Sequence, residues 1–228
     1  MNRQTCILAA LLLVLSSSAH ALELPVAGGR FSVPASSLKE IRFRSTLRQQ
    51  YDFSCGSAAL ATLLTYHYAH PVSEQQVFEA MFLNGDQAKI RKEGFSLLDM
   101  QHYLAGKGWR ADGFQLPLQK LVDARLPAIV LIADKGYQHF VVIKGIDQSR
   151  VLLGDPSSGT RAMTRAAFEA VWPSKLLFVI HDHPGTGAAV AFNGVSDWRA
   201  APAAPLGAAL SQEALSSLTL PRFGPGDF

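Results

Sequence analysis

The chain has 228 residues, of which 48% are hydrophobic and 17% charged, so it can bury a sizeable core. Its formal net charge is only +3, and its densest basic stretch is Arg42, Arg44 and Arg48 around Phe43. Nucleic-acid binding normally requires a larger basic patch or a recognisable motif. We therefore expect no nucleic-acid partner.

The first 21 residues have the pattern of a secretory signal. Met1-Asn2-Arg3 is a short basic start, Ile7 to Leu15 is an apolar run, and Ala19-His20-Ala21 is a small-x-small cleavage pattern. The apolar run is too short to cross a bilayer as a helix. We expect cleavage after Ala21, export to the periplasm and no stable membrane span afterwards. An uncleaved N-terminal anchor is the alternative.

Only one cysteine remains once the signal, which contains Cys6, is removed. This residue, Cys55, has no internal partner for a disulfide, although exported proteins meet an oxidising compartment. A lone thiol there is a liability unless it is buried or used in chemistry. Cysteine count alone leaves both interpretations open.

Behind the signal, the chain changes from helical to strand periodicity. Residues 22–44 form a predicted lead-in with a short strand near 30–33. Helical spacing and capping signals predict helices over 55–68, 74–83, 97–105, 118–124 and 164–172. Apolar runs predict strands over 128–133, 139–146, 150–154 and 176–181. Most helices precede the strands, which indicates an α+β domain over 45–183 with helices packed on an antiparallel sheet.

Residues 184–228 are rich in Ala, Gly, Pro and Ser. This composition predicts a C-terminal tail that is partly disordered, with a short helix near 208–218. A segment that docks on the domain is the alternative.

The predicted helix that begins at Cys55 makes this thiol a candidate nucleophile. A helix N-terminus carries partial positive charge, which favours a thiolate. Gly56 and its small neighbours would let a substrate backbone approach. Tyr137 and Gln138, beside the start of a predicted strand, are candidates to line a substrate groove.

His139 and Asp155 are related by the predicted hairpin over 139–155. If the hairpin is tight and centred on Asp147, the two residues lie directly opposite each other and on the same face. Asp155 would then accept a hydrogen bond from one imidazole nitrogen and leave the other for Cys55. On spacing alone, a surface histidine and an Asp-Pro turn remain the other interpretation.

Attack of a thiolate on an amide also requires hydrogen-bond donors for the developing oxyanion. The backbone N–H of Cys55 is one candidate. A side-chain amide just upstream is a second, and both Gln49 and Gln50 are available.

Three segments, QQYDFSCGSAAL, QHFVVIKGI and VLLGDPSSG, resemble the C39 family of papain-like cysteine peptidases. Members are best known for removing double-glycine leaders from bacteriocin precursors. In that family a glutamine lies six positions before the cysteine, which selects Gln49. The resemblance implies a papain-like fold, catalysis by Cys55, His139, Asp155 and Gln49, and no cofactor. Ser54 departs from the family, because many members have Asp directly before the cysteine.

Family domains fused to transporters work in the cytoplasm, whereas this chain carries an export signal. A stand-alone exported member resembles the peptidase-like component of the Fap functional-amyloid secretion system. This resemblance implies a protein substrate such as an amyloid subunit or an outer-membrane secretion component. A fold that binds a peptide or acts as a chaperone without cleaving is the alternative, although it would not need all four site residues.

Two histidine pairs, His67-x-x-His70 and His181-x-His183, have metal-like spacing but lack an obvious third ligand. We therefore expect no metal. Gly28-Gly29 resembles a double-glycine cleavage site, but such a pair is more often a flexible turn.

Overall fold

The computed structural model describes residues 21–26, 29–34, 36–134, 136–184 and 190–201. The chain divides into two units, residues 1–41 and 42–228. In the first, β1 (Ala21–Val26) and β2 (Gly29–Pro34) pair as antiparallel strands, and β2 contains the predicted strand. The predicted signal, apart from Ala21, and the predicted helix near 208–218 lie outside the described residues.

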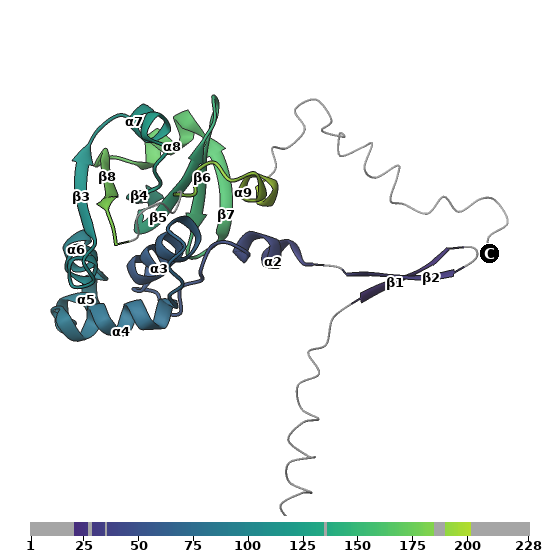
Figure 1. Cartoon of the computed structure of the whole chain (residues 1–228), viewed down its shortest axis with the longest axis horizontal. Coiled ribbons are helices and arrows are strands. Elements are labelled where there is room, and N and C mark those ends of the chain that lie inside the picture. Colours follow the sequence, from purple (N-terminus) through teal and green to yellow (C-terminus); the bar gives the residue numbers. More distant parts are fainter. Residues whose placement is uncertain (1–20, 27–28, 35, 135, 185–189, 202–228) are drawn as a thin grey trace, which may run out of the picture. The chain divides into compact units, whose positions relative to one another are not determined.

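The second unit is built on one antiparallel sheet in the order β3-β8-β4-β5-β6-β7 (Figure 1). Its strands are β3 (Arg110–Gln115), β4 (Ala128–Asp134), β5 (Tyr137–Ile146), β6 (Arg150–Asp155), β7 (Gly159–Thr164) and β8 (Leu176–Asp182). The sequence pattern predicts the four apolar strands. It misses β3 and β7, the two edge strands, because their sequences RADGFQ and GTRAMT lack an apolar run.

Helices precede, separate and follow the strands of this sheet along the chain. They are α2 (Leu38–Phe43, across the boundary of the two units), α3 (Cys55–His67), α4 (Glu74–Asn84), α5 (Gln87–Glu93), α6 (Leu97–Ala105), α7 (Gln119–Ala124), α8 (Arg165–Val171) and α9 (Val195–Ala200). Capping boxes open α4 at Ser73 and α6 at Ser96, as their spacing predicts. Among the described helices, none combines the length and apolar character needed to cross a membrane.

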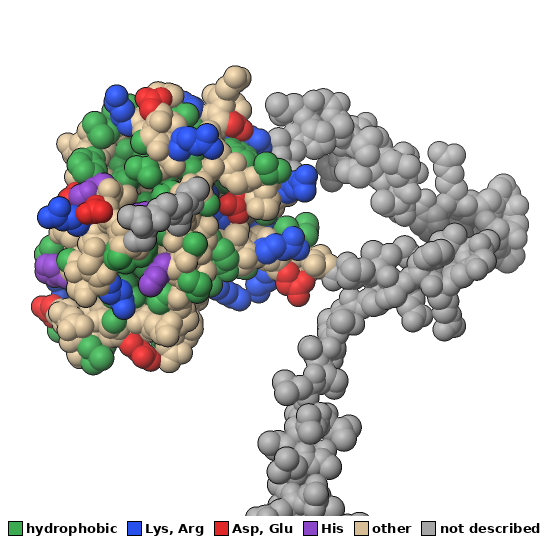
Figure 2. Space-filling model, viewed as in Figure 1, with side chains coloured by type: hydrophobic (Ala, Val, Ile, Leu, Met, Phe, Trp, Pro, Cys, Tyr) green, Lys and Arg blue, Asp and Glu red, His purple; other side chains and the backbone are tan. Residues whose placement is uncertain are grey.

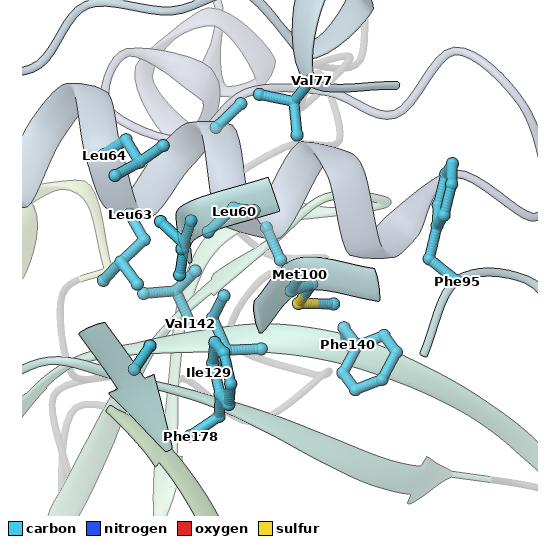
Figure 3. Close-up of a cluster of buried hydrophobic side chains, with 14 of the residues drawn as sticks. Leu60, Leu63, Leu64, Val77, Phe95, Met100, Ile129, Phe140, Val142 and Phe178 are labelled. Atoms are coloured by element: carbon cyan, nitrogen blue, oxygen red, sulfur yellow. The ribbon is translucent and has the colours of Figure 1, made fainter. Parts of the chain in front are cut away.

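Two apolar clusters form because side chains alternate along each strand. In one cluster, Leu60 and Leu63 of α3 meet Ile129, Val142 and Phe178 of the sheet (Figure 3). The second cluster contains the alternate strand residues together with side chains of α7 and α8. Each fully buried Leu contributes roughly 1.5–3 kcal/mol. Helix α3 therefore cannot slide along the sheet, and its first residue is fixed near β5.

The β5–β6 hairpin corrects the predicted register. Val142 pairs with Gly154 and Ile143 with Leu153, but Gly145 pairs with Leu152, so the strand is bulged at Lys144. The turn is also centred beyond Asp147, because Ile146 pairs with Val151 and the Asp147 N–H donates to the carbonyl of Arg150. The expectation of a tight hairpin centred on Asp147 is therefore wrong, and His139 is not directly opposite Asp155. The bulge leaves the two residues on a diagonal of the same face, a separation that longer side chains still span.

Residues 190–201, in the predicted tail, pack on this domain. The buried Lys144 Nζ donates to Asp197 Oδ1 at 2.8 Å and to the carbonyl of Ser45 at 2.7 Å. Asn193 accepts a hydrogen bond from the Ile146 N–H at 2.8 Å and donates to its carbonyl at 3.1 Å. This segment therefore docks on the bulged hairpin, in agreement with the alternative expectation of a docking segment.

Asp197→Ala should destabilise the protein, because it leaves the fully buried Lys144 without a counter-charge. The side chains of Lys144 and Asp197 are 0% and 13% exposed. We expect a loss of about 3 kcal/mol in the free energy of unfolding, measured by urea titration. Arg199→Ala, on the same helix but exposed, should change it by less than about 0.5 kcal/mol. Equal unfolding midpoints for the two variants would contradict the role of the Lys144–Asp197 pair.

Candidate active site

Cys55 is the first residue of α3, and a tight turn presents it. The N–H and the Oγ of Ser54 both donate to the carbonyl of Tyr51, at 3.1 and 3.0 Å. Ser54 is the N-cap residue, yet its side chain makes no capping bond because it closes this turn instead. Serine at this position thus has a local structural role.

The Cys55 thiol is buried, and its surroundings have opposite effects on its pKa. Burial raises the pKa of Cys55, whereas the backbone N–H groups of Phe140, Gly56 and Cys55 itself lower it. The net result is a raised pKa. The backbone N–H groups at the helix start therefore lower the pKa of Cys55, as expected, but by less than burial raises it.

His139 and Asp155 are brought together, as predicted, inside the protein. Their side chains are 8% and 3% exposed, and His139 Nε2 lies 3.2 Å from Asp155 Oδ2. The other ring nitrogen, Nδ1, is buried and has no hydrogen-bond partner among the described residues. The Cys55 thiol faces the backbone N–H of Phe140, the residue directly after His139. Nδ1 is thus the ring nitrogen of His139 that no described residue engages.

Two further residues hold the Asp155 carboxylate. Oδ1 accepts hydrogen bonds from the backbone N–H and the Oγ of Ser157 at 2.9 and 2.7 Å. Oδ2 accepts from Arg161 Nε at 3.0 Å. Burial alone would raise the pKa of Asp155, but hydrogen bonds from His139 and Ser157 hold it well below its usual range.

The contacts of Ser157 and Arg161 with Asp155 are not among those predicted from the sequence. The Asp-Pro-Ser order is a turn signal that points to Ser157, because Asp side chains commonly accept from the N–H two residues on. Arg161 has no such local signal, since its approach to Asp155 depends on the strand β7.

Gln49 lies between the ends of the strand and the helix that carry Asp155 and Cys55. Its backbone N–H donates to the carbonyl of Pro156 at 3.1 Å, and its Nε2 donates to the carbonyl of Tyr51 at 3.1 Å. It is half-buried, whereas Gln50 is exposed. Only Gln49 is therefore tied both to the residue after Asp155 and to the turn before Cys55.

A hollow of about 730 Å³ opens beside Cys55. Its apolar lining includes Phe53, Phe95, Leu131, Phe140 and Leu176. Its charged lining consists of Asp52, Arg91, Lys92 and Glu93. An extended segment with apolar side chains fits such a lining better than a strongly charged one.

Both predicted groove residues beside His139 line this hollow. The Tyr137 hydroxyl donates to the carbonyl of Asp52 at 2.9 Å, and its ring stacks on His139 with centroids 5.6 Å apart. Gln138 is exposed at the same strand end. Tyr137 therefore connects the loop before Cys55 to the strand that carries His139.

Gly56 is buried, and its small size has a different reason from the one expected. A Cβ at this position would lie 2.9 Å from Met100 Cε and 3.0 Å from Phe95 Cβ. The space beside Gly56 is thus occupied by packed side chains, and only its backbone N–H faces the thiol.

The histidine pairs serve packing and hydrogen bonding. His67 Nδ1 is 2.6 Å from the carbonyl of Ala191, and His181 Nε2 is 2.7 Å from Asp112 Oδ2. Among the described residues, no three His, Cys, Asp or Glu side chains are grouped to hold a metal.

On the face shown in Figure 2, Lys and Arg side chains are interspersed with acidic and apolar ones.

The sequence is similar to one protein family and to individual bacterial proteins. Residues 44–183 match the peptidase C39 family. A Pseudomonas aeruginosa (strain PAO1) protein named "Probable functional amyloid protease FapD" is 38% identical over 180 residues, which cover 78% of this chain and 80% of that protein. A Pseudomonas fluorescens protein of the same name is 41% identical over 136 residues, 60% of each chain.

Among solved structures, the peptidase domain of Streptococcus ComA, a bifunctional ABC transporter, is similar with a TM-score of 0.50 at 20% identity. The likeness covers 60% of this chain and 96% of that domain. At this identity it concerns the fold alone. It confirms the α+β, papain-like fold that the sequence resemblance implies.

His139→Ala should leave Cys55 unreactive near neutral pH. Because burial raises the pKa of Cys55, a thiol without a neighbouring base stays protonated there. We expect alkylation by iodoacetamide near pH 7 to be slower in the variant by about tenfold or more. The difference should narrow near pH 10, where hydroxide removes the proton in both proteins. Mass spectrometry of the labelled protein measures both rates, and equal rates near pH 7 would argue against a Cys55–His139 pair.

Proposed function

The chain belongs to the peptidase C39 family, and on that premise we propose that it is an exported cysteine endopeptidase acting in the periplasm. The observation that carries the proposal is the buried His139–Asp155 pair. No described residue bonds His139 Nδ1, and the Cys55 thiol meets the backbone N–H of the next residue, Phe140. This arrangement supplies a nucleophile, a base and a group that orients the base.

In the proposed reaction, the Cys55 proton passes to His139 Nδ1 and the sulfur attacks the carbonyl carbon of a peptide bond. The tetrahedral intermediate collapses as His139 returns the proton to the leaving amine, which breaks the C–N bond and leaves a thioester. A water molecule that loses a proton to His139 then attacks the thioester, and the C–S bond breaks to release the new carboxyl end. His139 returns the proton to the Cys55 sulfur, which restores the starting thiol. Asp155 orients the ring through Nε2 and stabilises the imidazolium.

The oxyanion of this intermediate would be held by two donors, the backbone N–H of Cys55 and the side-chain amide of Gln49. Gln49 Nε2 has two hydrogens, and in the free protein one of them is donated to the carbonyl of Tyr51, so the second remains for the oxyanion. The backbone bond of Gln49 to Pro156 keeps it close to Asp155.

We infer the substrate class from the hollow and from the relatives. The aromatic and aliphatic lining favours an extended segment with apolar side chains. The two Pseudomonas relatives are named functional amyloid proteases. An amyloid subunit or an outer-membrane secretion component is thus the proposed substrate or partner.

One observation favours a second function, a module that binds a peptide without cleaving it. In the free protein the pKa of Cys55 is raised by burial, which favours the less nucleophilic thiol. The hollow beside Cys55 would serve such a module equally well.

Cys55→Ala separates the two functions. A peptidase loses cleavage completely with this change but keeps its binding hollow, because the sulfur alone is removed. We expect the precursor of the partner to accumulate at full length in cells that contain the variant, and intact-protein mass spectrometry detects it. If the mature partner still forms at the wild-type level, the chain is a binding module.

Gln49→Ala and Gln50→Ala form a matched pair of adjacent glutamines. Loss of one oxyanion donor should lower kcat by about 10²–10³-fold in Gln49→Ala with little change in KM. Gln50 is exposed, so Gln50→Ala should retain nearly the wild-type kcat. The measurement is steady-state cleavage of the partner protein, and similar kcat values for both variants would remove Gln49 from the oxyanion hole.

A further inference from the structure

The positively charged side chain of Arg161 contacts the Asp155 carboxylate and has no part in the reaction described above. Arg161 Nε is 3.0 Å from Asp155 Oδ2, the same oxygen that lies 3.2 Å from His139 Nε2. The carboxylate that orients the imidazole is therefore shared between the imidazole and a permanent positive charge, since Arg stays protonated at any working pH.

The fold maintains this contact from a neighbouring strand. Arg161 lies on β7 opposite Leu153, and Gly159 lies opposite Asp155, so Arg161 reaches Asp155 diagonally. The turn between the strands needs glycine, because Gly159 has a φ of +83° and a Cβ there would lie 2.7 Å from Arg42 Cβ. The Arg161 side chain is 27% exposed, so part of it remains in contact with water.

We propose that Arg161 is a positioning residue that acts through Asp155, holding the carboxylate in place and cancelling much of its charge. Asp155 then orients His139 chiefly as a hydrogen-bond acceptor. This inference rests on the proposed peptidase function, because it assigns Arg161 a role in tuning the same Cys55–His139 pair.

The sign of the effect follows from the charges around the pair. His139 is faced by Asp155 of β6, with Arg161 of β7 behind it, and by the Tyr137 ring of β5. The Cys55 thiol of α3 meets the backbone N–H of the next residue, Phe140. An uncompensated carboxylate stabilises an imidazolium and destabilises a thiolate. After burial and the backbone donors, the charge of Asp155 already contributes to the raised pKa of Cys55. Removing Arg161 should therefore make the thiol harder to ionise.

The test is the pH dependence of Cys55 alkylation by iodoacetamide, which needs no protein substrate. In Arg161→Met, the pH of half-maximal alkylation should rise by about half a unit or more. Arg161→Lys keeps the charge and should stay within about 0.2 units of the wild type. Arg165→Met removes the same charge from a side chain that contacts the backbone carbonyl of Asp147, and should cause no shift.

A purely structural role for Arg161 predicts a different result. If Arg161 only props up Asp155, its loss lets the carboxylate move away, and the alkylation midpoint stays or falls. Either outcome in a folded Arg161→Met variant would overturn the proposal. If that variant fails to fold, Asp155→Asn/Arg161→Met compared with Asp155→Asn replaces it: the two midpoints should agree, and a rise on adding Arg161→Met would contradict the proposal.

The two proposals can fail separately. If Cys55→Ala leaves partner processing unchanged while Arg161→Met still raises the alkylation midpoint, the peptidase function is wrong and the electrostatic role of Arg161 stands. If Cys55→Ala abolishes processing and Arg161→Met leaves the midpoint unchanged, the peptidase function stands and Arg161 has no positioning role.

Discussion

Burial of α3 against the sheet is the constraint on which the site depends. All residues of this helix except Thr65 and Tyr66 are buried, so the helix has no freedom to rotate or slide. Cys55 is therefore delivered to a fixed point beside β5. The same burial removes the thiol from water and raises its pKa, which means that the packing that positions the thiol also opposes its ionisation. In the proposed reaction, its proton must therefore pass to a neighbouring base.

The neighbouring base is held by a chain of polar contacts that crosses several elements. Asp155 connects β5 through His139 and β7 through Arg161, and the next residue, Pro156, accepts from Gln49. Buried polar groups are stable only when their hydrogen bonds are satisfied. The Asp155 carboxylate meets that condition on both oxygens, whereas no described residue bonds His139 Nδ1. This nitrogen is therefore the position at which the proposed proton transfer can occur.

Much of this could be read from the sequence, and the failures have physical causes. Apolar runs identify β4, β5, β6 and β8, and the capping boxes at Ser73 and Ser96 locate α4 and α6 closely. The hairpin register fails because the turn is centred beyond Asp147 and no local pattern marks the bulge at Lys144. The side-chain contact survives this error because a diagonal neighbour remains in reach. Arg161 is not predicted because β7 is a polar edge strand, and the rise in the pKa of Cys55 is not predicted because burial depends on tertiary packing.

The bulged strand at Lys144 makes contacts with residues beyond the part of the chain that matches the family. Residues 44–183 match the family, yet Asp197 and Asn193 satisfy Lys144 and the backbone of Ile146 from outside that range. A fragment cut at the family boundary would leave the buried Lys144 amine without its counter-charge and the N–H and carbonyl of Ile146 without their side-chain partner. The domain therefore includes residues beyond the family match, and transplanting it into another chain requires Asn193 and Asp197 to travel with it.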